Sequence, residues 1–294
     1  MSIDHSSITA LGQGHEKQAE DQTDHLAKTY TVPSLVVDVV IPALNEAEAL
    51  PFTLKPLMEF VNGQKALPRS KAMIRTVVLV DNGSTDHTAE VAQAYGAQVI
   101  SEPRRGYGQA CLAGIAALKV DPPQALLFVD ADGSDDLSDL DHLLALLQIQ
   151  DPSELQDDTE RYAILTDKSP DLVIGSRARL AEANALTPLQ RFGNALSCRL
   201  LKWFFGAKFT DLGPFRVIRW SALKQIQMVD TNYGWTVEMQ AKASVYGLCS
   251  LEKDVRYFPR KAGDSKVSGT LKGSFKAGVK ILWTIWCSWL SKFK

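Results

Sequence analysis

Short apolar runs that alternate with helix-like segments most constrain the fold of this chain. The runs are apolar at nearly every position, rather than at every second one, and they cover residues 35–41, 76–80, 97–100, 125–129 and 171–177. Strands of this kind are buried on both faces, which is typical of a parallel sheet covered by helices on both sides. The sequence therefore predicts an α/β protein with a mainly parallel, Rossmann-like sheet.

Capping residues mark the helices between these runs. Helices are expected at residues 46–61, 87–95, 108–118 and 188–205. Thr85 or Asp86 is a suitable N-cap for the second of them, and Gly96 closes it. The last begins with Pro188 and is followed by Gly206. Residues 148–169 are polar and irregular, and predict an insertion or loop.

Composition excludes several classes of protein. A net charge of −2 gives no reason to expect nucleic-acid binding. The four cysteines have neither metal-type nor paired spacing, which indicates a reduced, cytoplasmic compartment. Residues 1–34 are polar, lack an apolar run of signal-peptide length and predict a disordered tail.

Acidic side chains follow several of the predicted strands. Asp130 and Asp132 stand directly after the run 125–129, while Glu46 and Asp81 follow earlier strands. In parallel α/β sheets ligands bind beyond the carboxyl ends of the strands, so these side chains are expected on one rim. Oxygen ligands suit Mg or Mn. The alternatives are a local Asp-Gly turn and four solvated loop carboxylates.

Six segments occur in an order that is more specific than any one of them: Pro42-Ala43-Leu44-Asn45-Glu46, Asp81-Asn82-Gly83-Ser84-Thr85-Asp86, Asp130-Ala131-Asp132, Gly175-Ser176-Arg177, Asp211-Leu212-Gly213-Pro214-Phe215-Arg216 and Arg260-Lys261-Ala262-Gly263-Asp264-Ser265-Lys266. In these segments the chain resembles the inverting glycosyltransferases of family 2, which have the GT-A fold. Within the family it is most similar to polyprenyl-phosphate (dolichyl-phosphate) mannose or glucose synthases and their bacterial relatives. The resemblance covers residues 37–285 and implies a glycosyltransferase domain at residues 35–270.

The resemblance implies a role for each matching residue. It implies nucleotide binding by Pro42, Ala43, Glu46, Asp81 and Asp130, and a Mg or Mn ion held by Asp130 and Asp132. Acceptor or phosphate contacts are implied for Asp211, Arg216 and Ser265. Catalytic roles are expected for Asp132, Arg177, Glu238, Arg260 and Lys266. Glu238 is either a general base or a group that orients Arg216 or Lys266.

The implied reaction moves a sugar from a nucleotide diphosphate, UDP-glucose or GDP-mannose, to a polyprenyl phosphate. Two alternatives stay open: a related transferase with a soluble or protein hydroxyl acceptor, and a nucleotide-sugar-binding protein without turnover. A dehydrogenase is disfavoured because the first strand ends in Pro42-Ala43-Leu44-Asn45-Glu46 instead of a glycine-rich turn.

Residues 271–294 predict an amphipathic C-terminal helix. Lys272, Lys276 and Lys280 recur every four residues, whereas Trp283 and Trp286 belong to an apolar side. The apolar stretch at residues 281–290 is too short to span a bilayer. A helix in the membrane interface, on the cytoplasmic face, is therefore expected, and a helix packed on the catalytic domain is the alternative.

Overall fold

The computed structural model describes residues 35–151, 155, 158–263 and 271–291. For residues 271–277 and 291 it describes the backbone alone. The predicted tail at residues 1–34 and two predicted site residues, Ser265 and Lys266, lie outside the described residues. Among the helices that are described, none has the length and apolar character needed to cross a membrane.

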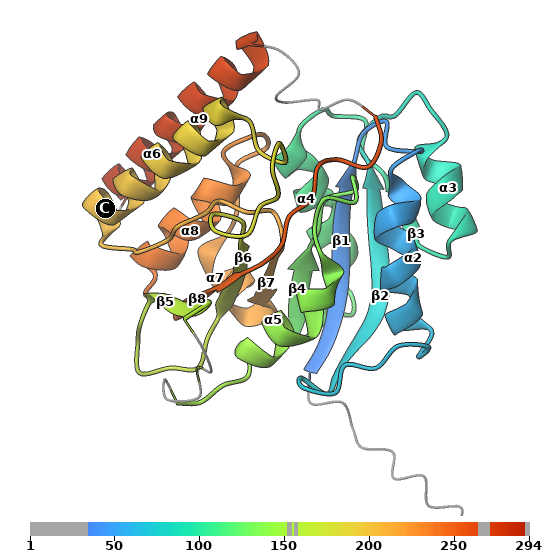
Figure 1. The fold of residues 1–294 in the computed structure, drawn as a ribbon, viewed down its shortest axis with the longest axis horizontal. Helices are drawn as coiled ribbons and strands as arrows, with labels where there is room; N and C mark the ends of the chain where they lie inside the picture. The colour runs from blue at the N-terminus through green and yellow to red at the C-terminus, as the bar shows by residue number, and fades with distance from the viewer. Residues whose placement is uncertain (1–34, 152–154, 156–157, 264–270, 292–294) are drawn as a thin grey trace, which may run out of the picture. The chain divides into compact units, whose positions relative to one another are not determined.

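One sheet of eight strands organises the described residues (Figure 1). Its strand order is β3-β2-β1-β4-β7-β6-β8-β5. The neighbours β3, β2, β1 and β4 are parallel, as are β6 and β8, whereas β7 and β5 run antiparallel to their neighbours. The strands are β1 (Leu35–Ala43), β2 (Ala72–Asp81), β3 (Gln98–Ser101), β4 (Ala125–Phe128), β5 (Glu160–Ile164), β6 (Leu172–Ser176), β7 (Arg216–Arg219) and β8 (Ser250–Asp254).

Alternation along β1 divides the core between the two faces of the sheet. Val37 and Val39 pack with α2 and α5, while Val40 packs with α4 and α8. On the second side, α6 and α9 lie against α8 and against each other (Figure 1). The helices are α2 (Leu50–Val61), α3 (Thr88–Ala94), α4 (Tyr107–Ala117), η1 (Leu137–Asp139), α5 (Leu140–Leu146), α6 (Pro188–Phe205), α7 (Trp220–Ile226), α8 (Trp235–Val245) and α9 (Leu271–Ser291).

The predicted α/β class, a helix-covered and mainly parallel sheet followed by a C-terminal amphipathic helix, is confirmed. The prediction that residues 148–169 are irregular is wrong in part, because β5 occupies Glu160–Ile164. Strands β7 and β8 also lack a run of apolar residues, since they carry charged residues such as Arg216 and Glu252. Pairing with apolar neighbours in the sheet, rather than their own composition, makes them strands.

A close approach between α4 and the sheet is possible only at a residue without a side chain. A Cβ atom on Gly114 would lie 2.6 Å and 2.9 Å from the two γ-methyl groups of Val40, and 3.2 Å from Cγ2 of Val80. Valine side chains are stiff and these two are fully buried, so neither has room to move. Gly114 thus sets the distance between α4 and β1.

We expect the Gly114→Ala substitution to lower the free energy of unfolding by about 1–2 kcal/mol, because overpacking outweighs the gain in helix propensity. Gly193→Ala in α6 is the matched control, since a Cβ there meets nothing within 4 Å. It should raise stability by up to about 1 kcal/mol. Urea unfolding measures both changes. A Gly114→Ala protein as stable as the wild type would contradict the close-packing argument.

Candidate active site

A cavity of about 440 Å³ opens at the carboxyl edge of the sheet. Segments far apart in the chain meet there because the parallel strands β1, β2 and β4 all end at this edge. The cavity is lined by Pro42, Ala43, Leu44, Glu46, Asn82, Arg105, Gly106, Tyr107, Ala110, Asp130, Ala131, Asp132, Arg177, Gln190, Leu212, Pro214, Asn232, Tyr233, Thr236, Tyr257 and Arg260. Seven of the predicted site residues are therefore brought together: Pro42, Ala43, Glu46, Asp130, Asp132, Arg177 and Arg260.

Hydrogen bonds tie the loop after β1 to the loop after β2. Asn45 accepts from the backbone amide of Thr85 at 2.7 Å, and the amide of Glu46 donates to Oγ1 of Thr88 at 2.9 Å. Thr88 in turn donates to Asp86. Asn45 has a positive φ of 53°, which Asn tolerates better than most residues. The loops thus form one wall that carries Pro42, Ala43 and Glu46.

Three carboxylates gather where β4 ends. The backbone amide of Asp130 donates to Oδ2 of Asp135 at 3.2 Å, and Oδ1 of Asp132 accepts from the amide of Ser134 at 3.0 Å. Burial, followed by repulsion from Asp132, raises the pKa of Asp130 to about 7. Burial and repulsion from its two neighbours also raise the pKa of Asp135 well above its ordinary value. The tyrosine hydroxyl of Tyr107 donates to Oδ1 of Asp130 at 3.1 Å.

The chemistry of this cluster suits a hard divalent cation. Its side chains offer only oxygen atoms, and Oδ1 of Asp135 is buried without a hydrogen-bond partner among the described residues. Within the described part of the chain, no three His, Cys, Asp or Glu side chains form a metal-binding group. Two carboxylates suffice when substrate phosphates and water supply the other ligands, as they commonly do for Mg. Asp130 and Asp132 therefore fit the predicted Mg or Mn.

Arg260 connects two sides of the cavity. Its Nη1 lies 2.5 Å from Oε2 of Glu46, and its Nη2 lies 3.2 Å from Oδ2 of Asp132. Glu46 is 7% exposed, so its charge requires a partner. Arg260 follows β8, whereas Glu46 and Asp132 follow β1 and β4. One guanidinium group thus joins the wall after β1 to the carboxylate cluster.

Arg177 is fixed more firmly than Arg260. Its Nε and Nη2 donate to the two carboxylate oxygens of Asp211 at 2.7 Å and 2.9 Å, and its backbone amide donates to Oδ2 at 2.8 Å. The guanidinium carbon lies 4.9 Å from the centre of the Tyr257 ring, a cation–π arrangement. Such a bidentate, stacked arginine keeps its direction without a ligand.

Asp211 and Arg216 make their described contacts within the protein, so their implied contact with an acceptor or phosphate stays a prediction. Asp211 is fully buried and uses both oxygens on Arg177, so it orients that arginine. Arg216 is 1% exposed and donates to the carbonyl groups of Gly213 and Thr236. Burial lowers the pKa of Arg216 to about 10. Its guanidinium group therefore links two segments of the cavity wall from behind.

Glu238 also lies behind the cavity wall. It is 2% exposed, and its carboxylate accepts from the backbone amides of Val229 and Asp230. Its third partner is Lys242, whose Nζ lies 2.7 Å from Oε1. Glu238 thus bonds to these groups and not to Arg216, whereas Lys266 lies outside the described residues; the role of Glu238 as a base or an orienting group stays a prediction. A carboxylate that accepts hydrogen bonds from backbone amides fixes the loop that contains them, which here is the segment leading into α8.

Other cavity residues carried a weaker signal in the sequence. Asp81 ends β2 and accepts from the amide of Ser84, but it does not line the cavity. Its neighbour Asn82 does, and both ends of its amide group bond to backbone between Glu102 and Gly106. Tyr107 sits between two glycines, a spacing that allows close backbone approach. Nothing in the sequence pointed to Asn232 or Tyr257.

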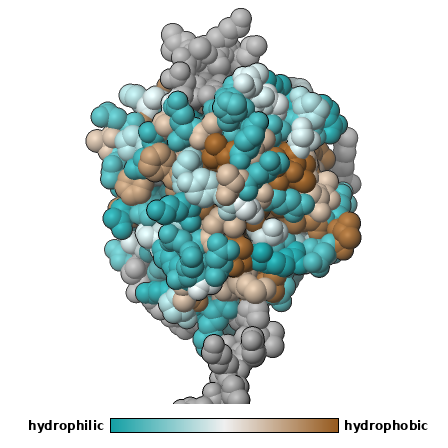
Figure 2. Space-filling model, turned by 90° about the vertical axis from the view of Figure 1, so that its right-hand side faces the viewer, coloured by the Kyte–Doolittle hydropathy of each residue, from teal (hydrophilic) through white to brown (hydrophobic). Residues whose placement is uncertain are grey.

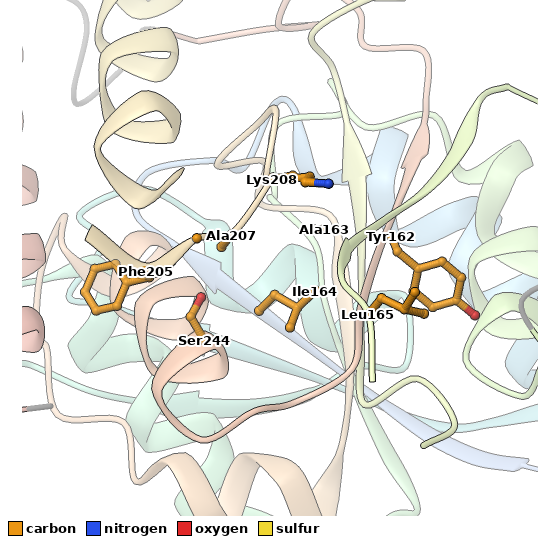
Figure 3. A pocket seen from close by; sticks show the side chains of 9 residues that line it. Tyr162, Ala163, Ile164, Leu165, Phe205, Ala207, Lys208 and Ser244 are labelled. Carbon is orange, nitrogen blue, oxygen red and sulfur yellow. The ribbon is translucent and has the colours of Figure 1, made fainter. Parts of the chain in front are cut away.

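A second cavity, of about 300 Å³, lies elsewhere in the domain. Figure 3 shows Tyr162 and Leu165 of the β5 segment on one side and Phe205 and Ala207 of the segment ending α6 on the other. Its lining is mostly apolar and contains no carboxylate. The first cavity is therefore the candidate for chemistry with phosphates.

Comparisons with known proteins show which family the chain belongs to. The sequence model of Glycosyl transferase family 2 matches residues 38–157. An uncharacterized glycosyltransferase of Mycobacterium tuberculosis is 37% identical over 241 residues, which are 82% of this chain and 94% of the relative. The undecaprenyl-phosphate mannosyltransferase of Micrococcus luteus is 27% identical over 248 residues, 80% of this chain and 88% of the relative. The dolichyl-phosphate beta-glucosyltransferase of Drosophila melanogaster is 29% identical over 210 residues, 66% of this chain and 59% of the relative.

Solved structures share the fold. Glucosyl-3-phosphoglycerate synthase from Mycobacterium tuberculosis, in complex with Mn²⁺, uridine diphosphate and phosphoglyceric acid, superposes with a TM-score of 0.59 at 18% identity. The match covers 87% of this chain and 79% of that chain. The chain therefore belongs to glycosyltransferase family 2, and it is a hexosyltransferase with the GT-A fold.

Proposed function

We propose that this enzyme transfers a hexose from a nucleotide diphosphate sugar to a polyprenyl phosphate, with inversion at the anomeric carbon and with a divalent cation as cofactor. The observation that carries the proposal is the shared cavity of Asp130, Asp132, Arg177 and Arg260. Two carboxylates for a cation and two arginines for phosphate oxygens suit a sugar nucleotide. Named relatives act on undecaprenyl phosphate and dolichyl phosphate, which supports the acceptor class.

We assign the nucleotide to the wall after β1 and β2. Pro42, Ala43 and Glu46 line this wall, and Asp81 ends the neighbouring strand. The hydrogen bonds between the two loops keep the wall in place before a donor arrives. UDP-glucose is the first candidate donor and GDP-mannose the second. A protein of the same fold binds uridine diphosphate, which supports ranking UDP-glucose before GDP-mannose.

Fixed positive charge is the main catalytic device in this proposal. The diphosphate gains negative charge as its bond to the sugar breaks, and Arg177 and Arg260 face the space where this charge develops. Asp211 keeps Arg177 in position, so little reorganisation is needed at the moment of reaction. When bound at Asp130 and Asp132, Mg or Mn supplies additional neutralisation of the leaving diphosphate. Lys266 is proposed to add positive charge at the phosphates, and Ser265 is proposed to contact the acceptor or a phosphate through its hydroxyl group.

The contacts of Glu238 favour an acceptor that needs no general base. A phosphate monoester has its second pKa near about 6, so it is already a nucleophile at neutral pH. A hydroxyl acceptor must instead lose a proton to a placed base. Glu238 is occupied by two backbone amides and Lys242. A polyprenyl phosphate is therefore preferred over a soluble or protein hydroxyl.

Exposed apolar residues on α6 and α9 support docking at a membrane surface. On α9, Val279, Trp283 and Trp286 are 51%, 61% and 45% exposed, and on α6 Trp203 is 79% exposed. The two helices run side by side (Figure 1). Figure 2 views the side that carries α2 and α3, where hydrophilic residues cover much of the surface. Tryptophan-rich surface beside lysines is typical of helices that lie in the membrane interface.

We expect Asp132→Ala to lower kcat by about 100-fold to 1000-fold, because one group that stabilises the developing charge is lost. Asp136→Asn is the matched control, since Asp136 follows the same strand but does not line the cavity. Calorimetry with UDP-glucose and Mn measures donor binding alongside the rate. Activity within twofold of the wild type would refute the metal assignment.

The acceptor is tested by a donor screen with undecaprenyl phosphate, in which labelled UDP- and GDP-sugars are followed by organic extraction. We expect label in the lipid phase only when enzyme, acceptor and a divalent cation are all present. Transfer to phosphoglycerate or to peptide hydroxyls, without lipid labelling, would favour the soluble-acceptor alternative. Donor binding without transfer or hydrolysis would favour a non-catalytic binding protein.

Docking is tested by sedimentation with vesicles that contain an anionic phospholipid. We expect the Val279→Ser/Trp283→Ser variant to bind at least about tenfold more weakly, because two exposed apolar side chains no longer enter the interface. Met73→Ser/Val120→Ser is the control, since these residues are 42% and 96% exposed on other parts of the surface. An equal loss of vesicle binding in both variants would argue against a specific docking face.

A further inference from the structure

A buried carboxylate joins the wall of the cavity to the C-terminal helix. Asp230 is 7% exposed and stands in the segment between α7 and α8. Its Oδ2 lies 2.8 Å from Nζ of Lys280 and 3.4 Å from Oγ1 of Thr284. Lys280 and Thr284 are four residues apart on α9, so both reach Asp230 from one helix face. The side chains of Trp283 and Trp286 on the same helix remain exposed.

The other oxygen of Asp230 shapes the segment that lines the cavity. Oδ1 accepts from the backbone amide of Asn232 at 2.7 Å and from that of Gly234 at 3.2 Å. Asn232 and Tyr233 both line the cavity. One carboxylate therefore fixes the backbone of this wall with Oδ1 and holds α9 with Oδ2. No larger residue fits at Gly234, where a Cβ would lie 2.4 Å from both Asp230 and Thr284.

The same segment also presses on the start of α4. The backbone amide of Gln109 donates to the carbonyl group of Thr231 at 2.9 Å. Gly106 and Gly108 approach the carbonyl groups of Thr231 and Asp230 so closely that a Cβ at either glycine would overlap them. Tyr107, between these glycines, donates to Asp130. The segment at residues 230–234 thus contacts α9 on one side. On the other side it contacts the start of α4, where Tyr107 bonds to Asp130.

We propose that Asp230 is a positioning residue that couples the seating of α9 to acceptor binding at Asn232 and Tyr233. This inference rests on the proposed function for the identity of the acceptor. The contacts of Asp230 with Lys280, Thr284, Asn232 and Gly234, here called the clamp, do not depend on that function. In the proposed function the nucleotide takes the wall after β1 and β2, which leaves the wall at Asn232 and Tyr233 for the acceptor. The side chain of Lys280 is 40% exposed and that of Asp230 only 5%, so loss of the lysine leaves a carboxylate largely out of water.

Lys280→Met tests the clamp without altering any residue of the cavity. We expect hydrogen exchange of the amides at residues 230–234 to become at least about fivefold faster, because the carboxylate that holds them loses its cation. With a short-chain polyprenyl phosphate in detergent, the acceptor KM should rise by a similar factor. The donor KM should stay within twofold, and Lys280→Arg should restore both readouts.

Lys202→Met is the matched control, because Lys202 is an exposed lysine on the neighbouring helix α6. It removes one positive charge from the same side of the domain but leaves Asp230 untouched. Asp230→Asn serves as a second test, since an amide oxygen still accepts from Asn232 and Gly234 while the ion pair is lost. It should reproduce the Lys280→Met result, and the double variant should add little.

Two results would overturn the inference. The first is that Lys280→Met and Lys202→Met have the same acceptor KM and the same rate of hydrogen exchange at the amides of residues 230–234. The other is an equal rise in the donor and acceptor KM, which general destabilisation would cause. Failure of the proposed function has a different signature, namely no lipid labelling by the wild type while the exchange of the loop still responds to Lys280→Met.

Discussion

Electrostatic balance at the carboxyl edge of the sheet is the constraint on which the site depends. Asp130, Asp132 and Asp135 lie close enough that burial and mutual repulsion raise the pKa of Asp130 and Asp135. Arg260 offsets part of this charge and joins Asp132 to Glu46. In the proposed function, a divalent cation and the diphosphate of the donor add opposite charges to this cluster together. Repulsion among the buried carboxylates therefore favours binding of the cation and the diphosphate as one complex.

The layers behind the cavity explain why so few of its residues can move independently. Asp211 is committed to Arg177, and Glu252 accepts from the amides of Thr210 and Asp211, which fixes the segment that carries this aspartate. Glu252 is itself fully buried and paired with Arg161 on β5. A chain of charges thus runs from β5 to the cavity through β8. Fully paired buried networks of this kind preorganise a site because each member restricts the next.

Sequence reasoning succeeded where a single strand and the loop after it determine the outcome. The apolar run before Asp130 predicted β4 and the position of the carboxylates, and the order of motifs predicted the family. It did not foresee contacts between residues that are distant in the chain. The side chain of Glu238 resembles that of a base, yet the amides of Val229 and Asp230 occupy it. Strand β7 was missed because pairing with β4 and β6, rather than its own residues, defines it.

The pairing of Asp230 with Lys280 illustrates the same limit and its functional meaning. The two residues are 50 positions apart, and neither belongs to a motif of the family. On its own, α9 is an amphipathic helix with lysines on one side, which describes a surface helix as well as a membrane-bound one. Contact with Asp230 gives one of these lysines a partner inside the domain. Because Asp230 also holds the amides of Asn232 and Gly234, the face of α9 that carries Lys280 and Thr284 is connected to the cavity wall. A helix attached in this way transmits displacement at its outer face to the site through a few short, directional contacts.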